Sequence, residues 1–141
     1  MFGEYSLILG ISIAVLAFFI DQLSKWLVAD IFLNHQAPIA LTPFFNLVEA
    51  WNTGVSFSLF DNGGIWGTII LSAFALAVVA FLLSWLKNEQ SRLVQAALGM
   101  IIGGALGNVA DRIRFGAVYD FLDFYYKGWH WPAFNAADSF I

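Results

Sequence analysis

Residues 62–86 read NGGIWGTIILSAFALAVVAFLLSWL, a stretch that contains no charged side chain and has Trp66 and Trp85 near its two ends. A helix needs about 20 mainly apolar residues to cross the hydrocarbon core of a bilayer. Tryptophans at both edges are typical of the two membrane–water interfaces. The stretch therefore predicts a membrane-spanning helix over about residues 64–86.

Two more uncharged stretches flank this helix. Residues 5–20 begin a predicted span that continues to about residue 27 and carries Asp21 and Lys25 on one face near its end. Residues 93–110 predict a span over about 93–111, and the short polar segment 87–92 makes it a membrane hairpin with the preceding helix. A fourth apolar stretch starts at about 134–141, and because the chain stops at Ile141 we expect this span to be truncated.

The composition agrees with a single membrane domain over residues 1–141. Of the 141 residues, 60% are hydrophobic and only 11% are charged, which is unlike a soluble domain. The net charge of −4 argues against a nucleic-acid partner. The chain has no cysteine, and its two histidines are far apart, so we expect no metal and no cofactor.

The segments between the predicted spans are different in character. Residues 29–61 mix prolines and polar side chains with β-branched and aromatic residues, especially from Phe44 to Val55, and predict an outer region with short strands. The second outer region, about 112–133, includes an extended or hairpin segment over residues 117–125. Lys87 and Arg92 favour a cytoplasmic hairpin turn, which puts both regions on the outer side, although basic residues beyond the third span weaken this argument.

Four aspartates gather in the last part of this apolar chain, where carboxylates are costly and usually mark a functional site: Asp111, Asp120, Asp123 and Asp138. Asp120 and Asp138 lie on opposite sides of a turn-rich segment, so folding could bring their carboxyls together. Two close carboxylates share one proton and can activate water against a peptide carbonyl. The alternative, that they are solvated loop acids, stays open on spacing alone, and Asp123 fits that alternative or a supporting role better.

Other polar residues surround these acids. Asn108 and Arg112 lie one helical turn apart with Asp111 beside them, and a structural ion pair at the end of the span is the simpler interpretation. Three small residues just before them, Gly103, Gly104 and Gly107, predict close helix packing. Asn52 could hydrogen-bond a substrate backbone, with Gly54 allowing close approach, or the segment could be a simple turn. The Asp21 and Lys25 pair is more typical of an interfacial ion pair than of a proton relay.

Taken in order, these segments resemble the bacterial lipoprotein signal peptidase family, also called signal peptidase II. The resemblance covers nearly the whole chain in five ordered blocks: Asp21 with Lys25; Asn52, Gly54 and Phe57; Gly103, Gly104, Ala105, Gly107, Asn108, Asp111 and Arg112; Val118, Asp120, Phe121, Asp123 and Phe124; and Phe134, Asn135, Ala137 and Asp138.

The resemblance implies an α-helical multi-pass membrane protein with four spans and a small extracytoplasmic β region. It also implies an aspartic endopeptidase of the bacterial cytoplasmic (inner) membrane that cuts prolipoproteins just before a diacylglyceryl-modified cysteine. Asp120 and Asp138 match the family's catalytic acids, and Asn52, Asn108, Arg112 and Asn135 match positions that line or brace the site. Asp111 is a rival for the first acid, because it also lies in an acid-containing motif, but its neighbour Arg112 favours a role as an ionised structural partner of that arginine. Lipid-modified prolipoproteins and membrane lipid are then the expected partners, and we expect a monomer.

One departure from the family pattern is Ser56, which replaces a common alanine and should be tolerated. Two other functions compete with this one. A non-enzymatic membrane protein, such as a small channel or assembly subunit, would use the polar residues 108–112 to brace its helices. A metal-dependent membrane protease would lose activity to chelators, and we expect no such loss.

Overall fold

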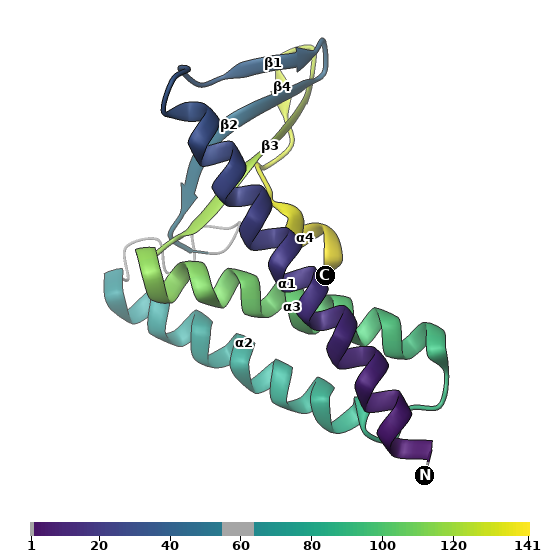
Figure 1. The fold of residues 1–141 in the computed structure, drawn as a ribbon. Coiled ribbons are helices and arrows are strands. Elements are labelled where there is room, and N and C mark those ends of the chain that lie inside the picture. Colours follow the sequence, from purple (N-terminus) through teal and green to yellow (C-terminus); the bar gives the residue numbers. More distant parts are fainter. Residues whose placement is uncertain (1, 55–63) are drawn as a thin grey trace.

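A computed structural model describes residues 2–54 and 64–141 (Figure 1). The expectations for Ser56 and Phe57, and for the end of the first outer region at Asp61, lie outside these residues. Within the described part the element order is α1, β1, β2, α2, α3, β3, β4 and α4.

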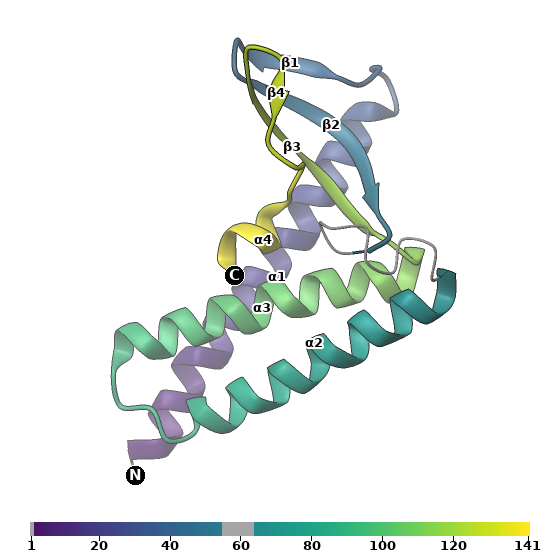
Figure 2. The ribbon, with the colours of Figure 1, turned by 180° about the vertical axis from the view of Figure 1, so that it is seen from behind.

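Three helices are long and apolar enough to cross a membrane: α1 (Phe2–Phe32), α2 (Gly64–Leu86) and α3 (Arg92–Phe115). α2 and α3 are antiparallel neighbours joined by a short turn, and the Ser91 hydroxyl caps the start of α3 by accepting from the Val94 backbone N–H (Figure 2). α1 crosses α3 obliquely, so the three helices diverge toward one end (Figure 1). The expected multi-pass helical membrane fold is confirmed.

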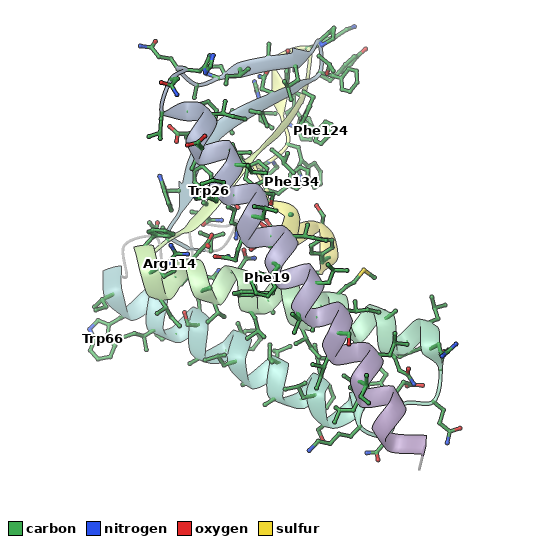
Figure 3. All side chains as sticks on the ribbon, in the orientation of Figure 1. Phe19, Trp26, Trp66, Arg114, Phe124 and Phe134 are labelled. Carbon is green, nitrogen blue, oxygen red and sulfur yellow. The ribbon has the colours of Figure 1, made fainter. Side chains whose placement is uncertain are left out.

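The buried core of the helices is small and apolar. It consists of one cluster contributed by all three helices: Ala14, Val79, Leu82, Leu86, Leu98 and Ile102. Large apolar side chains elsewhere on the helices point outward, among them Phe19 and Trp26 on α1 (Figure 3). Such an outward surface would be unusual in water and is suited to lipid.

The described segments between the long helices form a four-stranded antiparallel sheet in the order β1 (Ile39–Thr42), β2 (Phe45–Asn52), β3 (Val118–Tyr126) and β4 (Trp129–His130). The predicted β structure in both regions is therefore confirmed. β2 pairs with β3 so that Ala50 lies opposite Asp120. The sheet packs on the last turns of α1 through Val28, Tyr119 and Phe121, which fixes the start of β3 above the end of α3.

The last element is a short helix, α4 (Ala136–Phe140), which lies between the sheet and the crossing of α1 with α3 (Figures 1 and 2). Gly104 makes this contact possible, because a Cβ at that position would lie 2.7 Å from the Ala137 carbonyl oxygen. The helix carries Asp138 toward α3.

Two helices extend beyond the predicted ends of their membrane spans. α1 continues to Phe32 instead of ending near residue 27, since Val28, Ala29 and Phe32 gain a packing surface from the sheet. α3 continues to Phe115 instead of 111, and it ends where Gly116 adopts a left-handed conformation and its N–H donates to the Arg112 carbonyl. Both regions predicted to lie outside the membrane therefore begin with residues that are helical.

Candidate active site

Asp120 and Asp138 are joined through one asparagine. The Asn135 side-chain amide donates to Asp120 Oδ1 at 2.8 Å. The same residue caps α4: its side-chain oxygen accepts from the Asp138 N–H at 3.0 Å, and its own N–H donates to Asp138 Oδ2 at 3.2 Å. Asn135 is fully buried. It therefore holds both acids from one position.

Asn108 on α3 completes this network. Its side-chain oxygen accepts from Lys25 Nζ at 3.2 Å and from the Asn135 amide at 3.1 Å. Because that oxygen already faces two donors, the Asn108 amide nitrogen is turned toward Asp138 Oδ1, to which it donates at 3.1 Å. We call Asp120, Asp138, Asn108 and Asn135 the acid network.

The local sequence explains why Asp138 lies here. Asn135 is extended, and Asn135 and Asp138 make reciprocal side-chain to backbone bonds at the start of α4. Both oxygens of Asp138 are thereby engaged, one by the cap and one by Asn108. Asp138 is nevertheless exposed, whereas Asp120 is only 3% exposed. The two acids thus occupy unequal environments.

Burial and charge act together on Asp120. Desolvation, followed by repulsion from Asp138, raises the pKa of Asp120 to about 7, although hydrogen bonds from Asn52 and Asn135 and the charge of Lys25 oppose the rise. Arg112 faces the same acids, with its strongest attraction to Asp138 and the next to Asp120. The site therefore holds one acid that retains its proton near neutral pH beside a fixed positive charge.

Asp111 has different partners from those we expected. Its carboxylate lies 2.8 Å from Lys25 Nζ, and it accepts from the Gln22 amide and the Tyr119 backbone N–H, both at 3.1 Å. The ion partner of Asp111 is thus Lys25 on α1, and the expectation that Arg112 serves this role is wrong. The reason is that the crossing of α1 with α3 buries Asp111 against the face of α1 that carries Lys25.

The predicted Asp21 and Lys25 pair is confirmed, with 2.8 Å between Lys25 Nζ and Asp21 Oδ2. Both residues are buried, and the other oxygen of Asp21 accepts from the Ala137 N–H at 2.9 Å. We call Asp21, Lys25 and Asp111 the ion cluster. It ties α1, α3 and α4 together directly behind the acid network.

The predicted close packing at the α3 glycines is also confirmed. A Cβ at Gly103 would collide with the Ala14 carbonyl oxygen, and one at Gly107 would collide with the Asp21 carboxylate. Only glycine allows α1 to approach α3 closely enough for the ion cluster to form.

Asn52 and Gly54 lie at the end of β2. The Asn52 side-chain oxygen accepts from the Gly54 N–H at 3.0 Å, which is a local turn, while Asn52 also hydrogen-bonds Asp120. The turn and the contact with the site are therefore combined in one residue.

Asp123 does not belong to the acid network. It accepts from the Asn46 amide at 3.2 Å and lies 2.8 Å from His130 Nδ1, so it braces the β2–β3–β4 part of the sheet. Because Asp123 follows Asp120 by three residues in β3, its side chain points to the opposite face of the strand.

Sequence reasoning missed Gln22 and Tyr119. Gln22, which follows Asp21 directly near the end of an apolar helix, bonds both Asp21 and Asp111, and its position beside the predicted ion pair was a usable signal. Tyr119 contributes through its backbone, with its N–H on Asp111 and its carbonyl accepting from Asn135 at 3.3 Å, and such a role leaves no trace in sequence. Among residues 2–54 and 64–141, no group of three or more potential metal-binding side chains occurs.

Comparison with known proteins identifies the family. The sequence model of Signal peptidase (SPase) II matches residues 13–141. The chain belongs to the signal peptidase II family. It is accordingly a membrane peptidase.

Individual relatives support the assignment of this chain to the signal peptidase II family. A protein named lipoprotein signal peptidase from Aeromonas hydrophila subsp. hydrophila is 46% identical over 131 residues, covering 92% of this chain and 78% of the relative. A protein of the same name from Polynucleobacter necessarius subsp. necessarius is 41% identical over 137 residues, covering 96% of this chain and 83% of the relative. A solved structure described as a bacterial membrane enzyme has a TM-score of 0.77 at 27% identity, covering 93% of this chain and 79% of the other.

Proposed function

We propose that this protein removes the signal peptides of prolipoproteins, cutting just before a diacylglyceryl-modified cysteine with water activated by Asp120 and Asp138. Membership in the signal peptidase II family and the name lipoprotein signal peptidase among its relatives support the substrate class. The observation that carries the mechanism is that Asn135 connects the two acids.

The chemistry follows from the unequal acids. One carboxylate takes a proton from water as the water oxygen attacks the scissile carbonyl carbon. The other carboxyl donates its proton to the amine nitrogen as the C–N bond breaks, and the new carboxyl group keeps the water oxygen. Asp120, which holds its proton to about pH 7, is suited to the acid role.

The surrounding groups serve this reaction in our proposal. Asn108 and Asn135 orient the acids, and Asn52 and Arg112 bind or polarise the peptide beside them. Gly54, Asp111, Asp21 and Lys25 hold these groups in position. Asp123 supports the sheet rather than the acids.

We also propose that residues 1–141 act as a single monomeric domain in the bacterial inner membrane, in contact with lipid and with the acid network on the extracytoplasmic side. Exposed Lys87 and Arg92 lie at the end of the α2–α3 hairpin opposite the sheet, which the positive-inside rule supports as the cytoplasmic end.

The test is cleavage of a synthetic diacylated prolipopeptide by the full chain in lipid vesicles. Asp120→Asn and Asp138→Asn should each abolish cleavage while the protein inserts normally. Asp30→Asn, the same change at an exposed acid near the end of α1, is the matched control and should cleave like the unaltered protein. Cleavage retained by either dyad variant would contradict the mechanism.

A further inference from the structure

Aromatic side chains gather on one face of the sheet at its β3–β4 end, around a hollow of about 450 Å³. Four of them, Phe44, Tyr126, Trp129 and Trp131, are more than half exposed. A contiguous exposed apolar surface of this kind marks a contact with a partner. We call these four residues, with two others that line the same hollow, the aromatic face: Phe44, Phe124, Tyr126, Trp129, Trp131 and Phe134.

The alternation of side chains along β3 determines where this face points. Asp120, Phe124 and Tyr126 are separated by even numbers of residues, so their side chains lie on one face of the strand. Asp120 points to the acid network, and Phe134, directly before Asn135, stacks on Phe124 with 5.8 Å between the ring centroids. The aromatic face therefore continues the surface that carries Asp120, on the side of the sheet where α4 lies (Figure 3).

The orientation of the sheet brings this face to the membrane surface. In both ribbon views the strands lie at a steep angle to α2 and α3, which are the helices of the membrane hairpin, so the strands run along the bilayer (Figures 1 and 2). The β3–β4 turn is the end of the sheet farthest from these two helices. Among the described residues, those that line the hollow all come from the sheet and the segments that join or follow its strands. The aromatic face thus extends sideways past the helices, over lipid.

The side chains have the chemistry of a membrane interface. Trp and Tyr rings combine an apolar body with one polar N–H or O–H, and they are enriched where hydrocarbon meets the lipid headgroups. The seven residues that line the hollow are all uncharged. Lys127 follows in the turn, with its Nζ 5.4 Å from the centroid of the Tyr126 ring, whereas Asp123 is paired with His130 on the other face. A cation at the rim and no carboxylate on the face complement a surface of lipid phosphates.

We propose that the aromatic face docks onto the lipid bilayer, with its rings among the glycerol and ester groups of the nearest leaflet and Lys127 at the level of the lipid phosphates. Asp120 lies on β3 and Asp138 follows β4, so this contact fixes the height of the acid network above the hydrocarbon. The contact with lipid does not depend on the proposed cleavage reaction, and vesicles without substrate are sufficient to test it.

Spin labels measure the depth of the aromatic face. The chain has no cysteine, so Phe44→Cys or Trp131→Cys accepts a single nitroxide while the other five rings stay in place. The full chain is placed in vesicles of phosphatidylethanolamine and phosphatidylglycerol. Collisions of each nitroxide with oxygen, which concentrates in lipid, are compared with collisions with a water-soluble nickel chelate. Phe74→Cys on the exposed surface of α2 is the lipid reference, and Gln36→Cys between α1 and β1 is the water reference.

We expect the ratio of oxygen to nickel collisions at positions 44 and 131 to lie well above the ratio at position 36, toward that at position 74. This result would place two separate segments of the aromatic face in the interface. Ratios at both positions equal to the ratio at position 36 would overturn the proposal.

A charge on the aromatic face distinguishes lipid contact from shielding by the protein itself. Trp129→Glu should shift the label at position 44 toward the nickel chelate, because it removes apolar area and places a negative charge against anionic lipid. Asn34→Glu adds the same charge at an exposed residue beyond α1 and should leave the label unchanged. An unchanged label in the Trp129→Glu protein would mean that the protein alone shields position 44, which contradicts docking onto lipid.

Other occupants of the aromatic face give different results. Shielding that appears only after a prolipopeptide is added would identify a peptide, and dipolar broadening between labels on two copies would identify a second chain. Either result would overturn the assignment to lipid. A protein that shows the expected label depths but cleaves no lipopeptide would refute the proposed function and leave the membrane contact intact.

Discussion

Lys25 on α1 lies 2.8 Å from the carboxylate of Asp111 on α3 and the same distance from Asp21 one turn earlier on its own helix. One buried ammonium thus contacts two buried carboxylates, and it also donates to Asn108, which holds Asp138. The helix crossing and the geometry of the acid network consequently depend on the same side chain.

Replacing this ammonium should destabilise the fold. Lys25→Met leaves Asp21 and Asp111 buried without a countercharge, and breaking a buried ion pair in this way costs about 3–5 kcal/mol. The measurement is the unfolding midpoint of the purified protein in detergent. Lys87→Met, which removes an exposed lysine, should stay within about 0.5 kcal/mol. Equal midpoints for both variants would contradict the assigned role of the ion cluster.

Adding one methyl group at Gly107 should also be harmful. The Cβ of Gly107→Ala would collide with the Asp21 carboxylate, which itself accepts from the Ala137 N–H at the start of α4. We expect a loss of about 1–3 kcal/mol, as for other overpacked sites, together with reduced cleavage. Ala80→Val, which enlarges an exposed residue of α2, serves as the control. A Gly107→Ala protein with unaltered stability would show that the two helices can separate freely.

Cleavage should decline on the alkaline side of neutral pH. The raised pKa of Asp120 means that its carboxyl keeps a proton up to about pH 7 and loses it above that value. If this proton goes to the leaving amine, kcat/KM falls about tenfold per pH unit above pH 7. A profile of kcat/KM between about pH 5 and 9 measures this limb. An alkaline limb that begins near pH 5 would rule out Asp120 as the acid.

The two functions of Asn135 can be separated by substitution. Asn135→Ala removes both the helix cap, worth about 1 kcal/mol, and the bond to Asp120. Asn135→Ser can restore the cap, but serine has no side-chain amide to donate to Asp120. We expect the serine variant to recover stability while kcat stays about tenfold to a hundredfold low, because the buried Asp120 carboxyl loses the hydrogen bond that orients it. If kcat recovers along with stability, Asn135 acts only as the cap of α4 and its bond to Asp120 is not needed for catalysis.

Asp123 should be dispensable for cleavage. Its partners are Asn46 and the half-exposed His130, so Asp123→Asn affects the sheet and not the acid network. We expect kcat within about twofold of the unaltered protein and a stability change of about 1 kcal/mol or less. The same lipopeptide assay measures both this variant and Asp120→Asn, and similar losses in the two would place Asp123 in the site after all.

Much of this protein is determined locally by its sequence. Residues 62–86 predict a span because an uncharged stretch as long as the bilayer is thick has few alternatives, and α2 occupies Gly64–Leu86. The Asp21 and Lys25 pair follows from one helical turn of spacing, and the glycines of α3 indicate close packing from their size alone. The concentration of acids near residues 111–138 likewise marks the site, because charge beside a membrane is costly.

The partners of those acids were decided only by the tertiary structure. Arg112 is next to Asp111 in the chain, yet Lys25 neutralises it because the crossing of two helices brings their buried faces together. The sheet determines how far α1 extends, and the end of β2 brings Asn52 to Asp120. Asn135 joins Asp120 to Asp138 because the fold places α4 beneath β3. Spacing along a chain limits which groups can meet, but burial and long-range packing select which of them do.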